Sequence, residues 1–157
     1  TWLIASWCVD GKPSAVGAAT GAVAGLVAIT PAAGFVGAMP AIVIGFVAGA
    51  LCFGSVKLIE KIKIDDALAV FGVHGIGGLW GALATGLFVG IGYGTLEVGR
   101  GEQIVNQIIA IAASGAWAFI VTGAIMLALK YTIGIKADEP SEHEGLDISE
   151  HGESAFE

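Results

Sequence analysis

Long apolar stretches with at most one formal charge each alternate along the chain with short polar segments. The apolar stretches cover about residues 15–29, 41–59, 67–90 and 103–133, and the chain also begins with the short apolar run TWLIASWCV. A membrane-spanning helix needs about 20 apolar residues, so the first run is too short to span, and the other four are the candidate spans. The pattern predicts an all-α integral membrane protein, with a bundle of transmembrane helices over residues 1–136 and a tail over residues 137–157. Because the first run looks like the end of a helix, we expect the chain to be the C-terminal part of a larger protein.

Turn residues and glycines mark the limits and the faces of these helices. Ser14 follows a Gly-Lys-Pro turn and is placed to cap the first complete helix, while Pro40 suits the first turn of the second. Residues four apart share one helix face, and small residues on that face let another helix approach closely. We therefore expect two close-packing faces, made by the glycines Gly17, Gly21 and Gly25 and by the pair Gly45 and Gly49.

Composition and charge strengthen the membrane assignment and set the tail apart. Hydrophobic residues make up 55% of the 157 residues and charged residues 13%, with a mean hydropathy of +0.83, which excludes an ordinary soluble domain. The last twenty residues hold eight carboxylates and no lysine or arginine, and they account for the net charge of −7. The remainder is nearly neutral and has no basic patch of the kind that binds nucleic acid. Cys8 and Cys52 lie in apolar segments without metal-ligand spacing, which predicts that both are small, buried apolar side chains.

The positive charges divide unequally between the two sides of the membrane. If successive loops alternate in side, one side holds only Arg100 and the other holds six lysines. Lysine-rich loops stay in the cytoplasm, so the sequence predicts a multi-pass protein of the cell membrane with a cytoplasmic acidic tail. The lysines of the predicted cytoplasmic side are Lys12, Lys57, Lys61, Lys63, Lys130 and Lys136.

His74 is the one ionisable residue within the apolar stretch 67–90. Such a residue inside a membrane helix is costly unless a partner, water or a polar path serves it, so it is a functional candidate. On a regular α-helix its face would also carry Phe71, Gly78 and other mostly small residues. The residues alone leave three interpretations open: a packed and hydrogen-bonded histidine, a ligand of haem or metal, and a path for a solute or proton. Ligation is disfavoured because the apolar stretches hold no second histidine and no carboxylate.

Two acidic residues, Asp65 and Asp66, directly precede this stretch. Carboxylates at that place suit the N-cap and the positive end of a helix over residues 67–90. A role at the cytosolic mouth of a path along the helix is the alternative.

Three segments together resemble the ammonium transporter family (Amt/Mep, related to the Rh proteins). The stretch DDALAVFGVHGIGGLWGALATGLF resembles the family's pore-lining tenth helix, and GKPSAVGAATGAVAGLVAITPAAGFVG resembles its seventh-to-eighth helix region. The segment EGLDISEHGESAF resembles its cytosolic C-terminal signature. One clear departure is Ala69, where the family pattern usually has an aspartate. The resemblance implies the C-terminal portion of an eleven-helix ammonium transporter fold, with the end of helix 7 and helices 8 to 11.

The resemblance also implies a function and its site. Members of the family carry ammonium or ammonia across the cell membrane through a hydrophobic pore in which two histidines face each other, without enzymatic catalysis, metal or cofactor. His74 matches the second histidine, and Phe71 and Gly78 lie with it in the pore-lining segment. Lys12 matches a family lysine on the cytosolic side, which implies a place at the cytosolic mouth with Asp65 and Asp66; a solvated lysine of a cytoplasmic loop is the alternative.

Family membership further implies a homotrimer in the lipid bilayer with one pore per subunit. In the family the tail packs against cytosolic loops and helps form a platform for the nitrogen-regulatory protein PII. Two rival functions stay open, namely an ammonium sensor that signals through the tail and a haem- or metal-bearing membrane subunit. The tail residues that match the family signature are Gly145, Leu146, Asp147, His151, Gly152, Glu153, Ala155 and Phe156.

Overall fold

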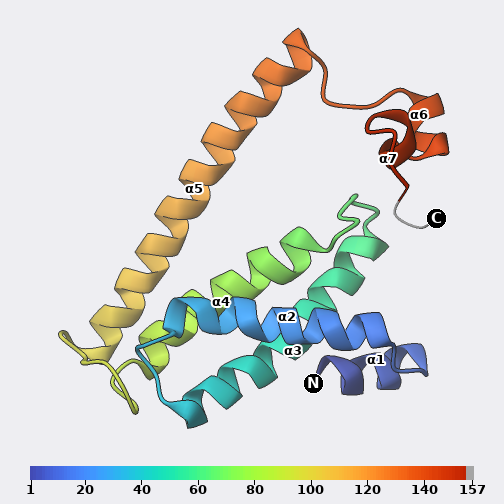
Figure 1. Ribbon diagram of the computed structural model, residues 1–157. Helices are drawn as coiled ribbons and strands as arrows, with labels where there is room; N and C mark the ends of the chain where they lie inside the picture. The colour runs from blue at the N-terminus through green and yellow to red at the C-terminus, as the bar shows by residue number, and fades with distance from the viewer. Residues whose placement is uncertain (155–157) are drawn as a thin grey trace. The chain divides into compact units, whose positions relative to one another are not determined.

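The structure, a computed structural model, describes residues 1–154, and its regular elements are helices (Figure 1). Between α2 and α3 lies a 3₁₀ turn over Thr30–Ala32, and a π-helical turn over Phe71–Gly75, called the π turn below, leads into α4. The described residues form no strand, and the predicted all-helical fold is confirmed. The α-helices are α1 (Trp2–Asp10), α2 (Ala15–Ile29), α3 (Ala38–Lys61), α4 (Ile76–Phe88), α5 (Arg100–Thr132), α6 (Glu139–Glu144) and α7 (Leu146–Ser149).

Four helical segments are long and apolar enough to cross a membrane, and they correspond one by one to the four predicted spans. The predicted cap of α2 is confirmed, because the hydroxyl oxygen of Ser14 accepts a hydrogen bond from the N–H of Gly17 at 2.8 Å. The second and fourth spans begin slightly earlier than predicted, and the third begins later, at the π turn. The four segments are Ala15–Ala32, Ala38–Lys61, Phe71–Phe88 and Arg100–Thr132.

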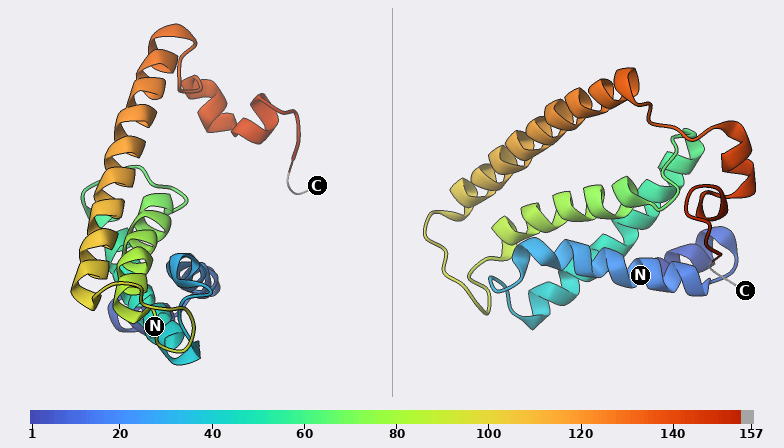
Figure 2. Two further views of the ribbon diagram at one scale, coloured as in Figure 1. Left: turned by 90° about the vertical axis from the view of Figure 1, so that its left-hand side faces the viewer. Right: turned by 45° about the horizontal axis from the view of Figure 1, so that its top comes forward.

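The chain divides into two compact units, and the first, Thr1–Ala113, contains α1 to α4 and the start of α5. Within this unit α2, α3 and α4 pack on one another, and α1 packs on α2 and α3 (Figures 1 and 2). Fully buried small side chains, among them Ala28, Ala48 and Ala84, fill the helix crossings. Membrane helices associate through such close packing, because lipid tails already satisfy larger apolar side chains.

Trp2 of α1 occupies much of the predicted glycine surface. A Cβ on Gly21 would lie 2.6 Å from the Cβ of Trp2, and one on Gly17 would lie 3.2 Å from its Nε1. On α3, a Cβ on Gly49 would lie 2.8 Å from the Cβ of Thr1. The predicted close packing is confirmed at these three glycines. The structure does not show close packing at Gly25 and Gly45, where an added Cβ would meet no atom of the described chain within 4 Å.

The loops of the first unit gather at two ends of the helices. At one end the α2–α3 loop meets the α4–α5 loop, where the N–H of Gly37 donates to the carbonyl oxygen of Ile91 at 2.8 Å. At the other end the α1–α2 turn, the last turns of α3 and residues 67–69 surround a common pocket. Lys57 therefore lies at the second end and Arg100 at the first, so the loops of this unit alternate as the sequence predicts.

The second unit begins at Ser114 and contains the rest of α5, followed by α6 and α7. No residue of α5 is buried within the described chain, although the helix carries many large apolar side chains. Asp138 caps α6, because its carboxylate accepts a hydrogen bond from the N–H of Ser141 at 3.3 Å. Hydrogen bonding from Ser141 holds the pKa of Asp138 below its usual value.

Candidate functional site

The carboxylate of Asp66 caps the N-terminal end of the third span. Its Oδ1 accepts a hydrogen bond from the N–H of Val70 at 2.7 Å, and its Oδ2 accepts from those of Phe71 at 3.0 Å and Gly72 at 3.1 Å. These N–H groups belong to the first turn, which leaves them without backbone partners, and a negative charge suits this end of the helix. The predicted capping role is confirmed for Asp66, and the described structure shows no such bond from Asp65.

The third span starts later than predicted because residues 67–69 form a tight turn. The N–H of Ala69 donates to the carbonyl oxygen of Asp66 at 2.8 Å, and Ala69 has a φ of 52°, in the left-handed region. This conformation interrupts a helix and is rare for a residue that carries a Cβ. The prediction of a helix from residue 67 was wrong because hydropathy does not register a single residue with positive φ. Aspartate, usual here in the family pattern, adopts this conformation more readily than alanine.

The π turn separates two side chains that a regular helix would place on one face. The N–H of Ile76 donates to the carbonyl oxygen of Phe71, five residues earlier, which is the π-helical spacing. Phe71 consequently shares an apolar pocket of about 490 Å³ with Ile76, while His74 and Gly78 share a different groove. The predicted common face of Phe71 and His74 was wrong because it assumed about 3.6 residues per turn. A pore-lining role for Phe71 stays a prediction.

His74 and Gly78 line an open groove of about 490 Å³ against α2. The imidazole is exposed and has no hydrogen-bond partner among the described residues. A Cβ on Gly78 would meet no atom within 4 Å, so the space beside the ring is open. The hydroxyl group of Thr30, which lines the groove, already donates a hydrogen bond to the carbonyl oxygen of Leu26 at 2.6 Å. The ring therefore borders an apolar surface, formed by Val23, Leu26, Val27, Thr30 and Pro31.

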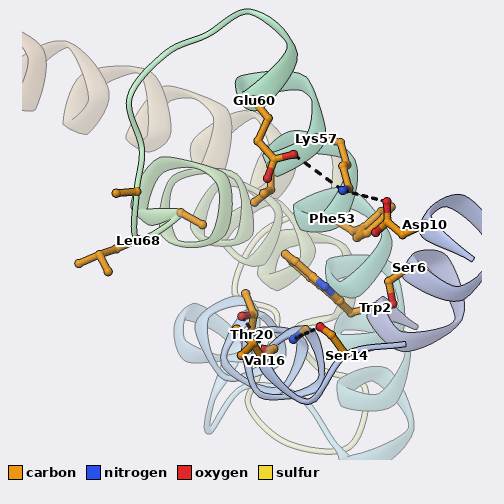
Figure 3. A pocket seen from close by; sticks show the side chains of 14 residues that line it. Trp2, Ser6, Asp10, Ser14, Val16, Thr20, Phe53, Lys57, Glu60 and Leu68 are labelled. Carbon is orange, nitrogen blue, oxygen red and sulfur yellow. Dashed lines mark hydrogen bonds and ion pairs between the residues drawn. The ribbon is translucent and has the colours of Figure 1, made fainter. Parts of the chain in front are cut away.

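A more polar pocket of about 440 Å³ lies at the end of the unit where the third span begins (Figure 3). Within it the Nζ of Lys57 lies 2.9 Å from Oδ1 of Asp10 and 3.8 Å from Oε2 of Glu60. The same ammonium group lies 5.7 Å from the centroid of the Phe53 ring, at cation–π distance. The sequence identified Lys57 only as one of several loop lysines. The pairing with Asp10 was missed because it joins distant segments and has no local sequence signal.

The three residues predicted at a cytosolic mouth do not form one cluster. Asp65 and Asp66 line the apolar pocket of Phe71, together with residues from the end of α3. Lys12 is exposed in the α1–α2 turn and lines none of the pockets described above. A functional role for these three residues stays a prediction. The α3 side of the apolar pocket is formed by Ser55, Leu58, Ile59 and Ile62.

Arg100 holds the far end of the third span. Its Nη1 donates to the carbonyl oxygens of Val89 at 2.8 Å, Leu87 at 2.9 Å and Gly86 at 3.3 Å. Carbonyl groups at a helix C-terminus lack backbone donors, and a cation suits the negative end of the helix dipole. The sequence identified Arg100 only as the single base on its side of the membrane, which gave no indication of this role.

The tail residues that match the family signature form a short local structure. Gly145 has a φ of 103° before α7, and the N–H of Glu153 donates to the carbonyl oxygen of Asp147 at 2.9 Å. A regulatory role for this segment stays a prediction. Of the other signature residues, Leu146, His151 and Gly152 lie in the same segment, whereas Ala155 and Phe156 lie outside the described residues.

Comparison of sequences gives a consistent picture along nearly the whole chain. The profile of the Ammonium Transporter Family matches residues 1–156. The chain is 46% identical over 162 aligned residues to the ammonium transporter of Bacillus subtilis and 43% identical over 158 residues to ammonium transporter Amt1 of Archaeoglobus fulgidus. Each alignment covers 99% of this chain and 40% of the relative, so the chain spans less than half the length of these relatives.

Comparison of structures agrees with the sequences. The crystal structure of Saccharomyces cerevisiae Mep2 superposes with a TM-score of 0.78 and 33% identity, over 88% of this chain and 34% of that one. The N240A mutant of Candida albicans Mep2 superposes with a TM-score of 0.79 and 35% identity, over 90% of this chain and 34% of that one. The match of the profile, the sequence identities and the shared backbone lead to one conclusion: the chain belongs to the ammonium transporter family.

Proposed function

We propose that the whole protein transports ammonium across the cell membrane and that this chain supplies one wall of the pathway. The observation that carries the proposal is the exposed imidazole of His74 on an apolar groove, within a helix long enough to span a membrane. Two relatives of the chain are themselves named ammonium transporters. Because the chain spans 40% of their length, the opposite wall, with a second histidine facing His74, is assigned to the remainder of the transporter.

The chemistry of the groove favours movement of neutral ammonia over movement of the intact cation. Transfer of an ammonium ion from water onto an apolar surface costs several kcal/mol unless charged or polar groups replace its hydration. In the proposed mechanism ammonium loses a proton before it enters the groove, ammonia crosses past His74, and the proton is restored on the other side. The imidazole can accept a proton on one ring nitrogen and release a proton from the other, so it can relay the separated proton.

We propose that the end of the first unit around Lys57 faces the cytoplasm. Lys12, Lys57 and residues 67–69 belong to this end, and Arg100 belongs to the other, which supports the alternation of loops on which the orientation rests. Positive charge concentrates in cytoplasmic loops, and this end carries most of the basic residues of the first unit. The acidic tail is then also cytoplasmic.

The tail is proposed as the regulatory element of a homotrimer, with PII as its partner. Six of the eight tail carboxylates lie between Asp138 and Glu150, so the segment offers a concentrated acidic surface to a cationic partner or loop. Deletion of residues 145–157 from the complete transporter is expected to lower transport or to abolish its inhibition by PII, while trimers still form. Unchanged transport together with an unchanged response to PII would contradict this role.

Growth on limiting ammonium tests the proposed function as a whole. Cells that lack their own ammonium transporters are given the complete gene, the same gene with His74→Ala, or an empty vector. The complete gene is expected to restore growth, and the His74→Ala gene is expected to restore it less or to change its dependence on pH. A complete gene that is present in the membrane and yet gives no more growth than the empty vector would refute ammonium transport by this protein.

A further inference from the structure

Cys52 of α3 lies directly behind the segment that carries His74 and contacts it at two points. Its Sγ donates a hydrogen bond to the carbonyl oxygen of Val73 at 3.7 Å, a length that reflects the large radius of sulfur. A Cβ on Gly77 would lie 3.3 Å from the same sulfur atom. The two contacts flank His74 along the chain, one immediately before it and one three residues after it. Cys52 is fully buried and Val73 is 3% exposed, so water does not compete for this bond.

The carbonyl group that Cys52 binds lies inside the π turn. The N–H of Ile76 donates to the carbonyl oxygens of both Phe71 and Val73, so the Val73 carbonyl shares this donor with another acceptor. A widened turn leaves backbone groups without their usual helical geometry, and buried carbonyl groups need a donor. The thiol of Cys52 supplies a second donor to the Val73 carbonyl, from a neighbouring helix.

We propose that Cys52 is a positioning residue for His74: its thiol holds the π turn against α3 and thereby sets the direction of the imidazole in the groove. A residue that only fills space would contribute volume, whereas a positioning residue needs its hydrogen-bond donor. The contact also extends to the groove wall, because a Cβ on Gly77 would lie 3.2 Å from Cγ1 of Val27, which lines the groove. Any effect of Cys52 on transport rests on the proposed function, whereas its effect on the orientation of the His74 ring does not.

The test measures the ring directly, in the complete transporter prepared with ¹⁵N-labelled histidine. The ring ¹⁵N signals of His74 are assigned by their loss in His74→Gln and are compared in Cys52→Ala, Cys52→Ser and Ile44→Val. Cys52→Ala removes the donor and is expected to displace the His74 signals. Cys52→Ser keeps a donor at a similar volume and is expected to leave them near their native positions. Ile44→Val is the control, because Ile44 is equally buried on the same helix but belongs to a different packing cluster from Cys52 and Val73.

Transport provides the second readout. Cys52→Ala is expected to lower the ratio of ammonium to methylammonium uptake about threefold, within the range of one lost hydrogen bond, while Cys52→Ser retains the ratio. If uptake does not respond to His74→Gln either, the proposed function fails, and the ring signals still decide whether Cys52 positions His74.

Native His74 signals in Cys52→Ala, or an equal displacement in Cys52→Ala and Cys52→Ser, would overturn the proposal. If Cys52→Ala does not assemble, Gly77→Ala replaces it, because its added methyl group presses on the sulfur from the other side. The proposal then requires displaced signals in Gly77→Ala and near-native signals in Cys52→Ser, and any other combination overturns it.

Discussion

Gly81 of α4 lies so close to Ala28 of α2 that a Cβ at position 81 would collide with the carbonyl oxygen of Ala28. The Cα of Ala28 would also lie only 3.1 Å from the added atom. Backbone atoms cannot move aside as the tip of a flexible side chain can. The contact therefore sets the separation of α2 and α4, and with it the width of the groove between His74 and the α2 wall.

Gly81→Ala is expected to destabilise the complete transporter by about 1–3 kcal/mol, because the helices must separate to admit the methyl group. The measurement is the thermal midpoint of the purified protein in detergent. Gly78→Ala is the matched control on the same helix, where the added methyl group meets open space, so its midpoint should stay near the native value. Equal losses in the two variants would contradict the close crossing at Gly81.

Asp66→Ala is expected to cost about 0.5–2 kcal/mol, because its carboxylate accepts hydrogen bonds from the N–H groups that begin the third span. Asp66→Asn should cost less, since its amide oxygen can still accept from these groups. Asp65→Ala serves as the control at the adjacent position. The thermal midpoint should therefore be highest for Asp65→Ala, intermediate for Asp66→Asn and lowest for Asp66→Ala. A larger loss in Asp65→Ala than in Asp66→Ala would reject the assignment of the cap.

Ala69→Gly is expected to stabilise the protein by about 0.5–1 kcal/mol. The left-handed conformation of Ala69 costs an alanine roughly 1–2 kcal/mol, and the greater freedom of glycine in the unfolded chain offsets part of that gain. The same exchange in a regular helix, Ala110→Gly in α5, should instead destabilise by about 0.5–1 kcal/mol. If Ala69→Gly lowers the thermal midpoint as Ala110→Gly does, position 69 does not adopt the left-handed conformation in the protein.

The four spans could be predicted from the sequence because hydropathy over a window of residues is a local property. The start of the third span could not, because it depends on one backbone angle at Ala69, an alanine that favours helix by every local measure. The pairing of His74 with Gly78 was predictable from a spacing of four residues. The separation of Phe71 from His74 could not be predicted, since no residue type is specific for a π turn.

The remaining parts of the site depend on which segments meet in space. Asp10 pairs with Lys57 across two helices, and the thiol of Cys52 reaches a carbonyl group of another helix. Neither contact leaves a periodicity or a motif in the sequence. The apolar segments around the two cysteines predicted burial for both, and the structure confirms it for Cys52. The prediction was wrong for Cys8, which is exposed within the described chain, and nothing in the sequence indicated the hydrogen bond of Cys52.

The proposed orientation predicts opposite labelling of two cysteines in intact cells. Ser141→Cys and Tyr93→Cys are made separately in a Cys8→Ser background, and each is exposed to an impermeant thiol reagent. Tyr93 is 66% exposed in the α4–α5 loop, so its cysteine should react from outside, while that at position 141 should react only after the cells are opened. The reverse pattern would invert the orientation and with it the cytoplasmic assignment of the tail.

Transport by the purified complete protein in liposomes tests the role of His74 most directly. An inward ammonium gradient is applied, and ammonium-dependent current and internal pH are followed for the native protein and for His74→Ala of equal folded amount. If His74 relays the separated proton, the variant should lose at least about tenfold in ammonium-dependent current, as expected for removal of a proton-transfer group. Native current and native selectivity for ammonium over potassium in His74→Ala would show that the ring takes no part in the pathway and would contradict the account.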